Sequence, residues 1–189
     1  IDIYSDFGIK KPKRDFSRGR RPQYDAERKG YYWNDHIRPE TSSHSLFKFD
    51  SKKSKEYLKA GFGVVNTHSH DGIMRGSGML VSLNPNSNNA YRIIDDNSAQ
   101  YLSFSKSVKS RQSYPTSRMG AMALLRQTYL DATWYANGKM KNKDLSLDAL
   151  NKNKNETQIF ETGNHVDALR ADKVGDEFGI QYTIVGSGD

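Results

Sequence analysis

The feature that most constrains the fold of this chain is a strand–helix–strand unit near its end. TQIFE, residues Thr157–Glu161, and IQYTIV, residues Ile180–Val185, both have the apolar residues of a buried strand. Between them, Asn164 can cap a helix and Gly179 can end it. Four apolar residues are predicted to share one face of that helix: Val166, Leu169, Val174 and Phe178. A helical crossover makes the two strands parallel, so we predict an α/β fold.

The first third of the chain has the same order of elements. Ile1–Ile3 is a short apolar strand, and a long excursion over residues 9–49 follows it. A helix capped by Asp50 or Ser51 is then predicted to run to Lys59, and Phe62–Asn66 is a second apolar strand. This order is again that of a parallel βαβ unit.

The middle of the chain is less regular. Residues 79–114 contain short apolar runs separated by a turn cluster, and we interpret these runs as antiparallel strands inserted beside the main sheet: MLVSL, AYRII and YLSFSKSV. A helix is predicted from Pro115 to Gly138, and a second over residues 144–152. In the first helix, apolar residues recur at three- and four-residue spacing: Met119, Met122, Leu125, Tyr129 and Ala132. We interpret its methionines as core residues rather than as a binding surface.

The composition limits the class of protein. A chain of 189 residues is long enough for one domain with a core, although only 35% of its residues are hydrophobic. No apolar run is long enough for a transmembrane helix. The absence of cysteine excludes disulfides, thiol catalysis and cysteine-bound zinc, and is compatible with the cytoplasm or an oxidising compartment. Because Ile1 begins directly in a strand, we expect no signal peptide here and interpret the chain as a fragment of a longer protein.

The net charge of +7 comes largely from one segment, Lys10–Arg21, which has seven basic residues and one acidic residue. Such a run can bind nucleic acid or another anionic surface, and it can equally be a solvated loop, which is the interpretation we favour. The aromatic and mixed-charge residues that follow it, up to Glu40, indicate an ordered excursion rather than a disordered basic tail.

Candidate functional residues follow the strand Phe62–Asn66, in the sequence His68-Ser69-His70-Asp71. Ligands bind at the carboxyl ends of strands in parallel α/β proteins. Two histidines at this spacing on an extended chain point to the same face, so they could share one zinc ion. The alternative, which the turn-like sequence SHDG favours, is hydrogen bonding within a loop.

Three glycines follow, Gly72, Gly76 and Gly78, and they indicate that the backbone turns and lies close to another segment. They do not form a phosphate loop, and the chain has no Gly-x-Ser-x-Gly elbow. Of the remaining histidines, we interpret His36 as a structural hydrogen-bonding residue and His165 as facing solvent.

Three long segments resemble a bacterial branch of the metal-dependent amidohydrolases, the branch similar to imidazolonepropionase. They are AGFGVVNTHSHDGIMRGSGMLVSLN, SFSKSVKSRQSYPTSRMGAMALLRQTYLDATWY and FETGNHVDALRADKVGDEFGIQYTIVGSG, and the resemblance extends to IDIYSDFG at the start. It implies a (β/α)8 barrel in which a metal-activated water attacks a C–N bond. A whole barrel needs about 250 residues. We therefore expect a partial TIM barrel, with residues 1–189 as part of one domain, 9–49 as a long excursion and 79–114 as an insertion.

The resemblance also assigns the family's metal-ligand positions. The His-x-His signature of active members corresponds here to Tyr4 and Asp6, and a later histidine ligand corresponds to Glu161. These replacements remove imidazole and weaken zinc binding, although Asp6 and Glu161 could weakly hold magnesium or calcium. His68 and His70 follow the wrong strand for the family's metal motif. They are candidates for lining a substrate pocket, together with Asp71 and Arg75.

Three functions follow as hypotheses. The first is an amidohydrolase-like domain with a degenerate metal site, and the second is an active hydrolase of C–N bonds completed by the rest of the parent protein. The third is a basic binding module acting through Lys10–Arg21. Expected partners are the rest of the parent chain or another copy, and a small-molecule substrate. Nucleic acid and a membrane span are not expected. For a bacterial protein of this type, we favour the periplasm or secretion over the cytoplasm.

Overall fold

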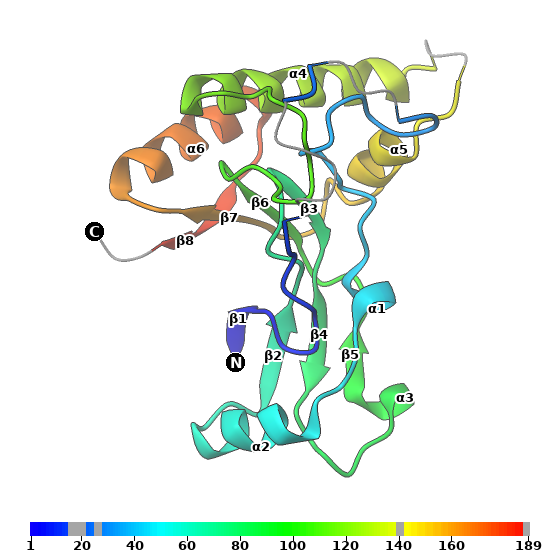
Figure 1. The fold of residues 1–189 in the computed structure, drawn as a ribbon, viewed down its shortest axis with the longest axis vertical. Coiled ribbons are helices and arrows are strands. Elements are labelled where there is room, and N and C mark those ends of the chain that lie inside the picture. Colours follow the sequence, from blue (N-terminus) through cyan, green and yellow to red (C-terminus); the bar gives the residue numbers. More distant parts are fainter. Residues whose placement is uncertain (15–21, 25–27, 139–141, 187–189) are drawn as a thin grey trace.

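The computed structural model describes residues 1–14, 22–24, 28–138 and 142–186, and it arranges them in two four-stranded mixed sheets (Figure 1). In the view of Figure 1 one sheet lies below the other, and the two meet near the middle of the molecule. The α/β class predicted from the sequence is confirmed. Within the described residues neither sheet closes into a barrel.

The first sheet contains the predicted N-terminal parallel pair. In sheet order its strands are β1 (Asp2–Ser5), β2 (Val64–Thr67), β4 (Met79–Ser82) and β5 (Ile93–Asp95). β1 and β2 are parallel, whereas β4 pairs antiparallel with β2 and β5. Three helices belong to this part of the chain: α1 (Ser43–Leu46), α2 (Ser51–Lys59) and α3 (Asn89–Arg92). The carboxylate of Asp50 accepts hydrogen bonds from two backbone N–H groups at the start of α2, so Asp50 is the cap of the two predicted candidates, Asp50 and Ser51.

The second sheet contains the predicted C-terminal unit. In sheet order its strands are β3 (Met74–Ser77), β6 (Gln100–Ser103), β7 (Gln158–Thr162) and β8 (Tyr182–Gly186). β6, β7 and β8 are parallel, and β3 is antiparallel to β6. The connecting helices are α4 (Arg118–Ala136), α5 (Leu145–Lys152) and α6 (His165–Phe178). The predicted antiparallel strand at YLSF corresponds to β6. It pairs antiparallel with β3 but parallel with β7, because α4 and α5 form the crossover between β6 and β7. The prediction is therefore wrong for the pairing with β7.

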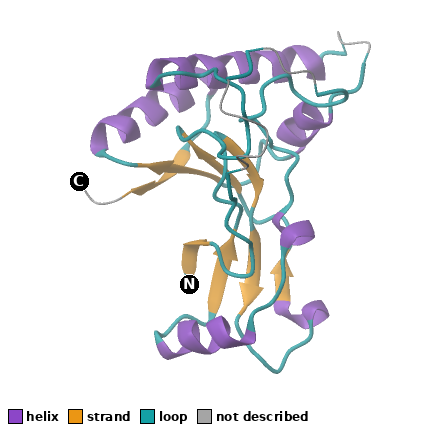
Figure 2. Cartoon of the chain, in the orientation of Figure 1, coloured by secondary structure: helices purple, strands orange, loops and turns teal. Residues whose placement is uncertain are grey.

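The main core lies between the second sheet and helices α4, α5 and α6, which lie on one side of that sheet in Figure 2. Its fully buried side chains include Leu102, Leu124, Leu125, Phe160 and Val174. A smaller core between the first sheet and α2 is formed by Phe7, Val65, Met79, Val81 and Leu83. Burial of these side chains stabilises each layer by about 25 cal/mol for each Å² of apolar surface removed from water.

The helix faces predicted from spacing need two corrections. In α4, Met119 is 80% exposed, and the buried stripe instead begins at Ala121. In α6, Val166 and Leu169 are exposed, whereas Val174 is buried as predicted. The α6 face toward the core includes Asp167, whose carboxylate pairs with Arg118 and Arg170. Periodicity alone misplaced this face because a paired carboxylate can be buried.

The chain passes from the first sheet to the second and back between β2 and β4. Two glycines permit this crossing. Gly76 has φ +89°, and a Cβ there would collide with the backbone of Thr41. A Cβ at Gly78 would collide with the ring of Tyr101. The expected close approach of the backbone is therefore confirmed.

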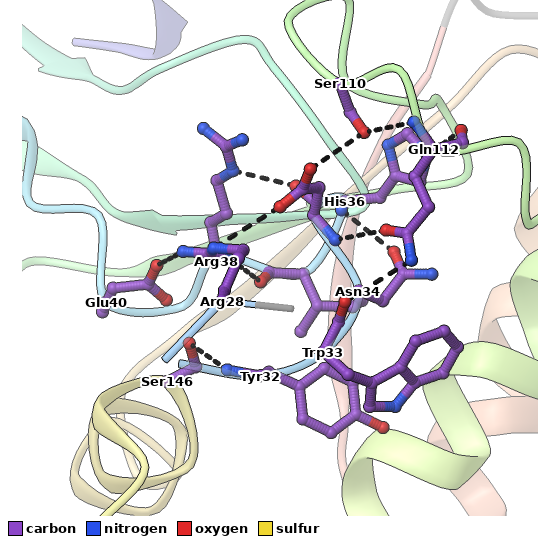
Figure 3. Close-up of polar contacts among 12 residues, drawn as sticks. Arg28, Tyr32, Trp33, Asn34, His36, Arg38, Glu40, Ser110, Gln112 and Ser146 are labelled. Atoms are coloured by element: carbon purple, nitrogen blue, oxygen red, sulfur yellow. Dashed lines mark hydrogen bonds and ion pairs between the residues drawn. The ribbon is translucent and has the colours of Figure 1, made fainter. Parts of the chain in front are cut away.

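Residues 28–42 of the excursion are ordered by a polar network, drawn in Figure 3. Arg28 forms ion pairs with Asp35 and Glu40, and the Asp35 backbone N–H donates to Gln112 Oε1 at 2.8 Å. The segment also lies along β3, with Ile37 and Ser42 bridging to the strand in parallel register. The excursion therefore covers the edge of the second sheet, in agreement with the prediction of an ordered segment.

Candidate functional site

The candidate site lies where the two sheets meet. Tyr4 is on β1, His68 and His70 come directly after β2, Arg75 is on β3 and Glu161 is on β7. β1, β2 and β7 belong to parallel pairs, so the side chains at their carboxyl ends can come together. The structure thus brings these five residues together. Polar contacts join Tyr4 and Glu161 to Arg75, and ring contacts join His68 and His70 to Tyr4.

Arg75 is the centre of the polar contacts. Its side chain is only 4% exposed, and its Nη2 forms an ion pair with the Glu161 carboxylate. Its Nη1 donates to Tyr4 Oη at 3.3 Å, and its Nε donates to the Gly72 carbonyl oxygen at 3.2 Å. The guanidinium therefore contacts both sheets through Tyr4 and Glu161. The planar fork of an arginine suits this kind of multiple contact.

The two histidines form a stack of rings with Tyr101, which lies on β6. The ring of His68 is parallel to that of Tyr101, with centroids 3.5 Å apart and planes 4° apart. The His68 and His70 centroids are 4.0 Å apart and their planes differ by 21°. Tyr4 packs obliquely against both imidazoles, with centroid distances of 5.1 and 4.5 Å. His68 is fully buried, and both of its ring nitrogens lack a hydrogen-bond partner among the described residues.

Burial favours the uncharged forms of the His68, His70 and Tyr4 side chains. Burial, and then the charges of His70 and Arg75, lower the pKa of the His68 imidazole well below its ordinary value. Burial and the Arg75 charge also lower the pKa of His70, whose Nε2 lies 3.3 Å from the Ser5 carbonyl oxygen. Burial raises the pKa of the Tyr4 phenol to about 12, with a further contribution from its hydrogen bond to Glu161. At neutral pH the site therefore contains neutral imidazoles and a protonated phenol.

Two other predicted residues have their hydrogen-bond or ion-pair partners outside this cluster. Asp71 accepts hydrogen bonds from Ser107 Oγ and from the Val108 backbone N–H, both at 2.7 Å. Its carboxylate thus holds the loop after β6. Asp6, which the resemblance placed at a ligand position, forms an ion pair with Lys11 at 3.2 Å. The basic segment Lys10–Arg21 lies in part outside the described residues, so its binding function stays a prediction.

The ligand positions implied by the resemblance do not fit a metal ion in this arrangement. A protonated phenol at Tyr4 is a poor ligand, and the Glu161 carboxylate is already paired with the Arg75 guanidinium. Within the described parts of the chain, no three His, Cys, Asp or Glu side chains are grouped as a metal site requires.

The stacked histidines do not share a metal either. The lone pairs of an imidazole lie in the plane of its ring, and the planes of His68 and His70 are nearly parallel at 4.0 Å. Lone pairs in parallel planes do not converge on one ion, as zinc ligands at about 2.1 Å must. This geometry favours the alternative in which the His-x-His segment makes contacts within the protein.

Tyr101 is the site residue that the sequence reasoning missed. Its Oη donates to the Ile3 carbonyl oxygen at 2.7 Å, and its ring forms one face of the histidine stack. The only signal in the sequence is its place in the alternating run YLSFSKSV, which cannot reveal a partner on β1.

A separate cavity of about 340 Å³ lies beside the start of α4, between residues 104–106 and 115–118. Its two cationic side chains already have partners. Lys106 Nζ donates to the Ser113 carbonyl oxygen at 2.6 Å, and Arg118 contacts the Phe104 carbonyl oxygen and Asp167. This cavity is distinct from the ring stack and holds none of the predicted site residues.

Comparison with known proteins supports the fold. No family model and no curated protein matches the sequence. A solved structure of an amidohydrolase from Thermotoga maritima MSB8 superimposes with a TM-score of 0.70 at 17% sequence identity. The match covers 97% of this chain and 49% of that protein, so the chain spans about half the length of this neighbour. At this identity the likeness establishes an amidohydrolase-like fold and nothing finer. Among the described residues no helix is long and apolar enough to cross a membrane.

Proposed function

We propose that this chain is part of an amidohydrolase-like barrel domain that binds a small molecule at a degenerate metal site and does not itself hydrolyse it. In this proposal residues 1–189 form part of one barrel of the imidazolonepropionase-like branch. Residues 9–49 are its long excursion and 79–114 its insertion. The remaining strands come from the rest of the parent chain or from another copy, and they pair with the edge strands β1 and β8.

The observation that carries the proposal is the engagement of Tyr4 and Glu161 with Arg75. In a metal-dependent hydrolase, ligands at these positions hold the ion that lowers the pKa of the attacking water. Here Glu161 neutralises a guanidinium, and Tyr4 keeps its proton. Neither side chain is left to activate a water through a metal. His70 and Glu161 remain partly accessible, so a small polar molecule can contact them.

The test is elemental analysis of the full-length protein together with hydrolysis assays. We expect less than one tightly bound metal ion per chain, and no turnover of amides, lactams or imides after loading with zinc or manganese. Glu161→Gln is the informative variant, and Glu177→Gln, which alters an exposed carboxylate, is its control. Stoichiometric zinc or hydrolysis that is lost in Glu161→Gln and retained in Glu177→Gln would contradict the proposal.

A further inference from the structure

We infer that the Arg75 guanidinium is the resident cation of the candidate site and takes the place of a divalent metal ion at the junction of the two sheets. The inference rests on the proposed function for the identity of the ligand positions. It adds the group that replaces the ion and predicts what the site does when that group is removed.

The first support is position. A metal ion in a barrel binds ligands from the ends of several strands around one cation. Arg75 does the same with a covalently attached charge, because its contacts are on three different segments: Tyr4 on β1, Glu161 on β7 and Gly72 before β3. Tyr4 belongs to the first sheet and Glu161 to the second. The guanidinium therefore links the two sheets where they meet.

The second support is charge. Arg75 is buried, and its partner carboxylate on Glu161 is about one-third exposed. The rings beside this pair, those of Tyr4, His68 and His70, contact one another through their faces. Arg75 and Glu161 are thus a cation and an anion in close contact. A divalent ion entering the site would meet a fixed positive charge and a carboxylate that is already paired.

The third support is that every guanidinium nitrogen of Arg75 contacts a group of the protein. All three nitrogens of its guanidinium have a partner within the chain. A buried charge without partners would be strongly destabilising, so these contacts make the pair self-sufficient. An arginine that served to bind a ligand would instead direct its fork toward an accessible surface.

A double-mutant cycle in the full-length protein tests the inference. The variants are Arg75→Met, Glu161→Met and the double variant, and the measurement is the melting temperature by circular dichroism. We expect each single variant to lose about 5 °C, because each leaves a charge without its partner. The double variant should regain most of this loss. Arg126 and Glu177, a more exposed ion pair between α4 and α6, are the matched control, and their cycle should show little coupling.

The second measurement is the response to zinc chloride. We expect no shift in melting temperature for the wild type, whose Glu161 carboxylate is paired with Arg75. Arg75→Met should show a small rise, because it frees that carboxylate beside His70. The double variant, which lacks the carboxylate, should show no rise. If Arg75→Met does not fold, Arg75→Gln and Glu161→Gln replace the two apolar variants, because glutamine removes the charge and keeps a polar side chain.

Three results would overturn the inference: coupling no larger than in the control pair, an equal zinc shift in the wild type and Arg75→Met, or no zinc response in Arg75→Met. Hydrolysis without any metal, combined with strong coupling, would contradict the proposed function and leave the role of Arg75 standing. Absent coupling together with no hydrolysis would contradict the role of Arg75 and leave the proposed function standing.

Discussion

His36 and His68 are both fully buried, yet the surroundings of their rings are opposite. His36 Nδ1 accepts the Ser107 backbone N–H at 3.0 Å, and its Nε2 lies 3.2 Å from the Gln112 carbonyl oxygen. The ring is part of the network in Figure 3, and the interpretation of His36 as a structural hydrogen-bonding residue is confirmed. His68 has no such partner within the described residues and contacts its neighbours through its ring faces.

This difference separates the hydrogen-bonded surroundings of His36 from the junction of the two sheets, where the His68 ring nitrogens have no partner among the described residues. Buried polar groups in proteins are nearly always hydrogen-bonded, and an unpaired one costs about 1–3 kcal/mol. Within residues 28–42 both ring nitrogens of His36 satisfy this rule, whereas Glu40 Oε2 is buried without a hydrogen-bond partner among the described residues. The junction of the two sheets departs from it at His68, beside the buried charge of Arg75. Departures of this kind are concentrated at functional sites.

The largest expected effect on the free energy of unfolding is at His36. His36→Phe keeps the size of the ring but leaves the Ser107 N–H and the Gln112 carbonyl oxygen without their partner. We expect a loss of about 3 kcal/mol in the free energy of unfolding, measured by urea denaturation. A loss below about 1 kcal/mol would show that water replaces the imidazole and would remove the contrast with His68.

Asp71 is expected to behave like His36 rather than like a pocket residue. Asp71→Ala removes two charge-assisted hydrogen bonds to the loop at Ser107 and Val108. We expect a loss of about 2 kcal/mol in the free energy of unfolding. The zinc response of Arg75→Met should be unchanged by the added substitution. A changed zinc response would place Asp71 in the site, as the sequence first suggested.

The pH dependence of stability compares the two regions directly. Burial lowers the pKa of both His36 and His68 in the folded state. The unfolded chain therefore binds more protons below pH 6.5, so stability is fully present above that pH and is lost as the pH falls. Each histidine contributes up to about 1.4 kcal/mol per pH unit. Urea denaturation between pH 7.5 and 5 measures the slope, and a flat profile would contradict the burial of these neutral rings.

The smallest effect is expected for His68→Phe. An apolar ring of similar shape keeps the stacking against Tyr101 and removes two unpaired buried nitrogens. We expect a change within about 0.5 kcal/mol of zero at pH 7, and a shallower loss of stability toward pH 5. A loss as large as that of His36→Phe would mean that the His68 nitrogens have partners that stabilise the fold.

The sequence predicted the elements better than their contacts. The helices over 50–59 and 144–152 and the final βαβ unit were all found from capping residues and apolar periodicity, because these signals act between neighbours in the chain. Two residues that were predicted to face the core, Met119 in α4 and Leu169 in α6, are exposed. Which face of a helix is buried depends on what packs against it, and Asp167 is buried there because Arg118 reaches it from α4.

By itself, the sequence determined an α/β chain with two parallel crossovers, an ordered excursion and a polar segment at the carboxyl end of β2. Only the tertiary structure decided that Arg75 pairs with Glu161 and Tyr4, that Tyr101 stacks on His68 and that Asp71 holds a loop. Tyr4 and Arg75 are 71 positions apart, and Tyr101 and Ile3 are 98 apart. Contacts over such separations arise from the packing of whole sheets, and no local pattern of residues encodes them.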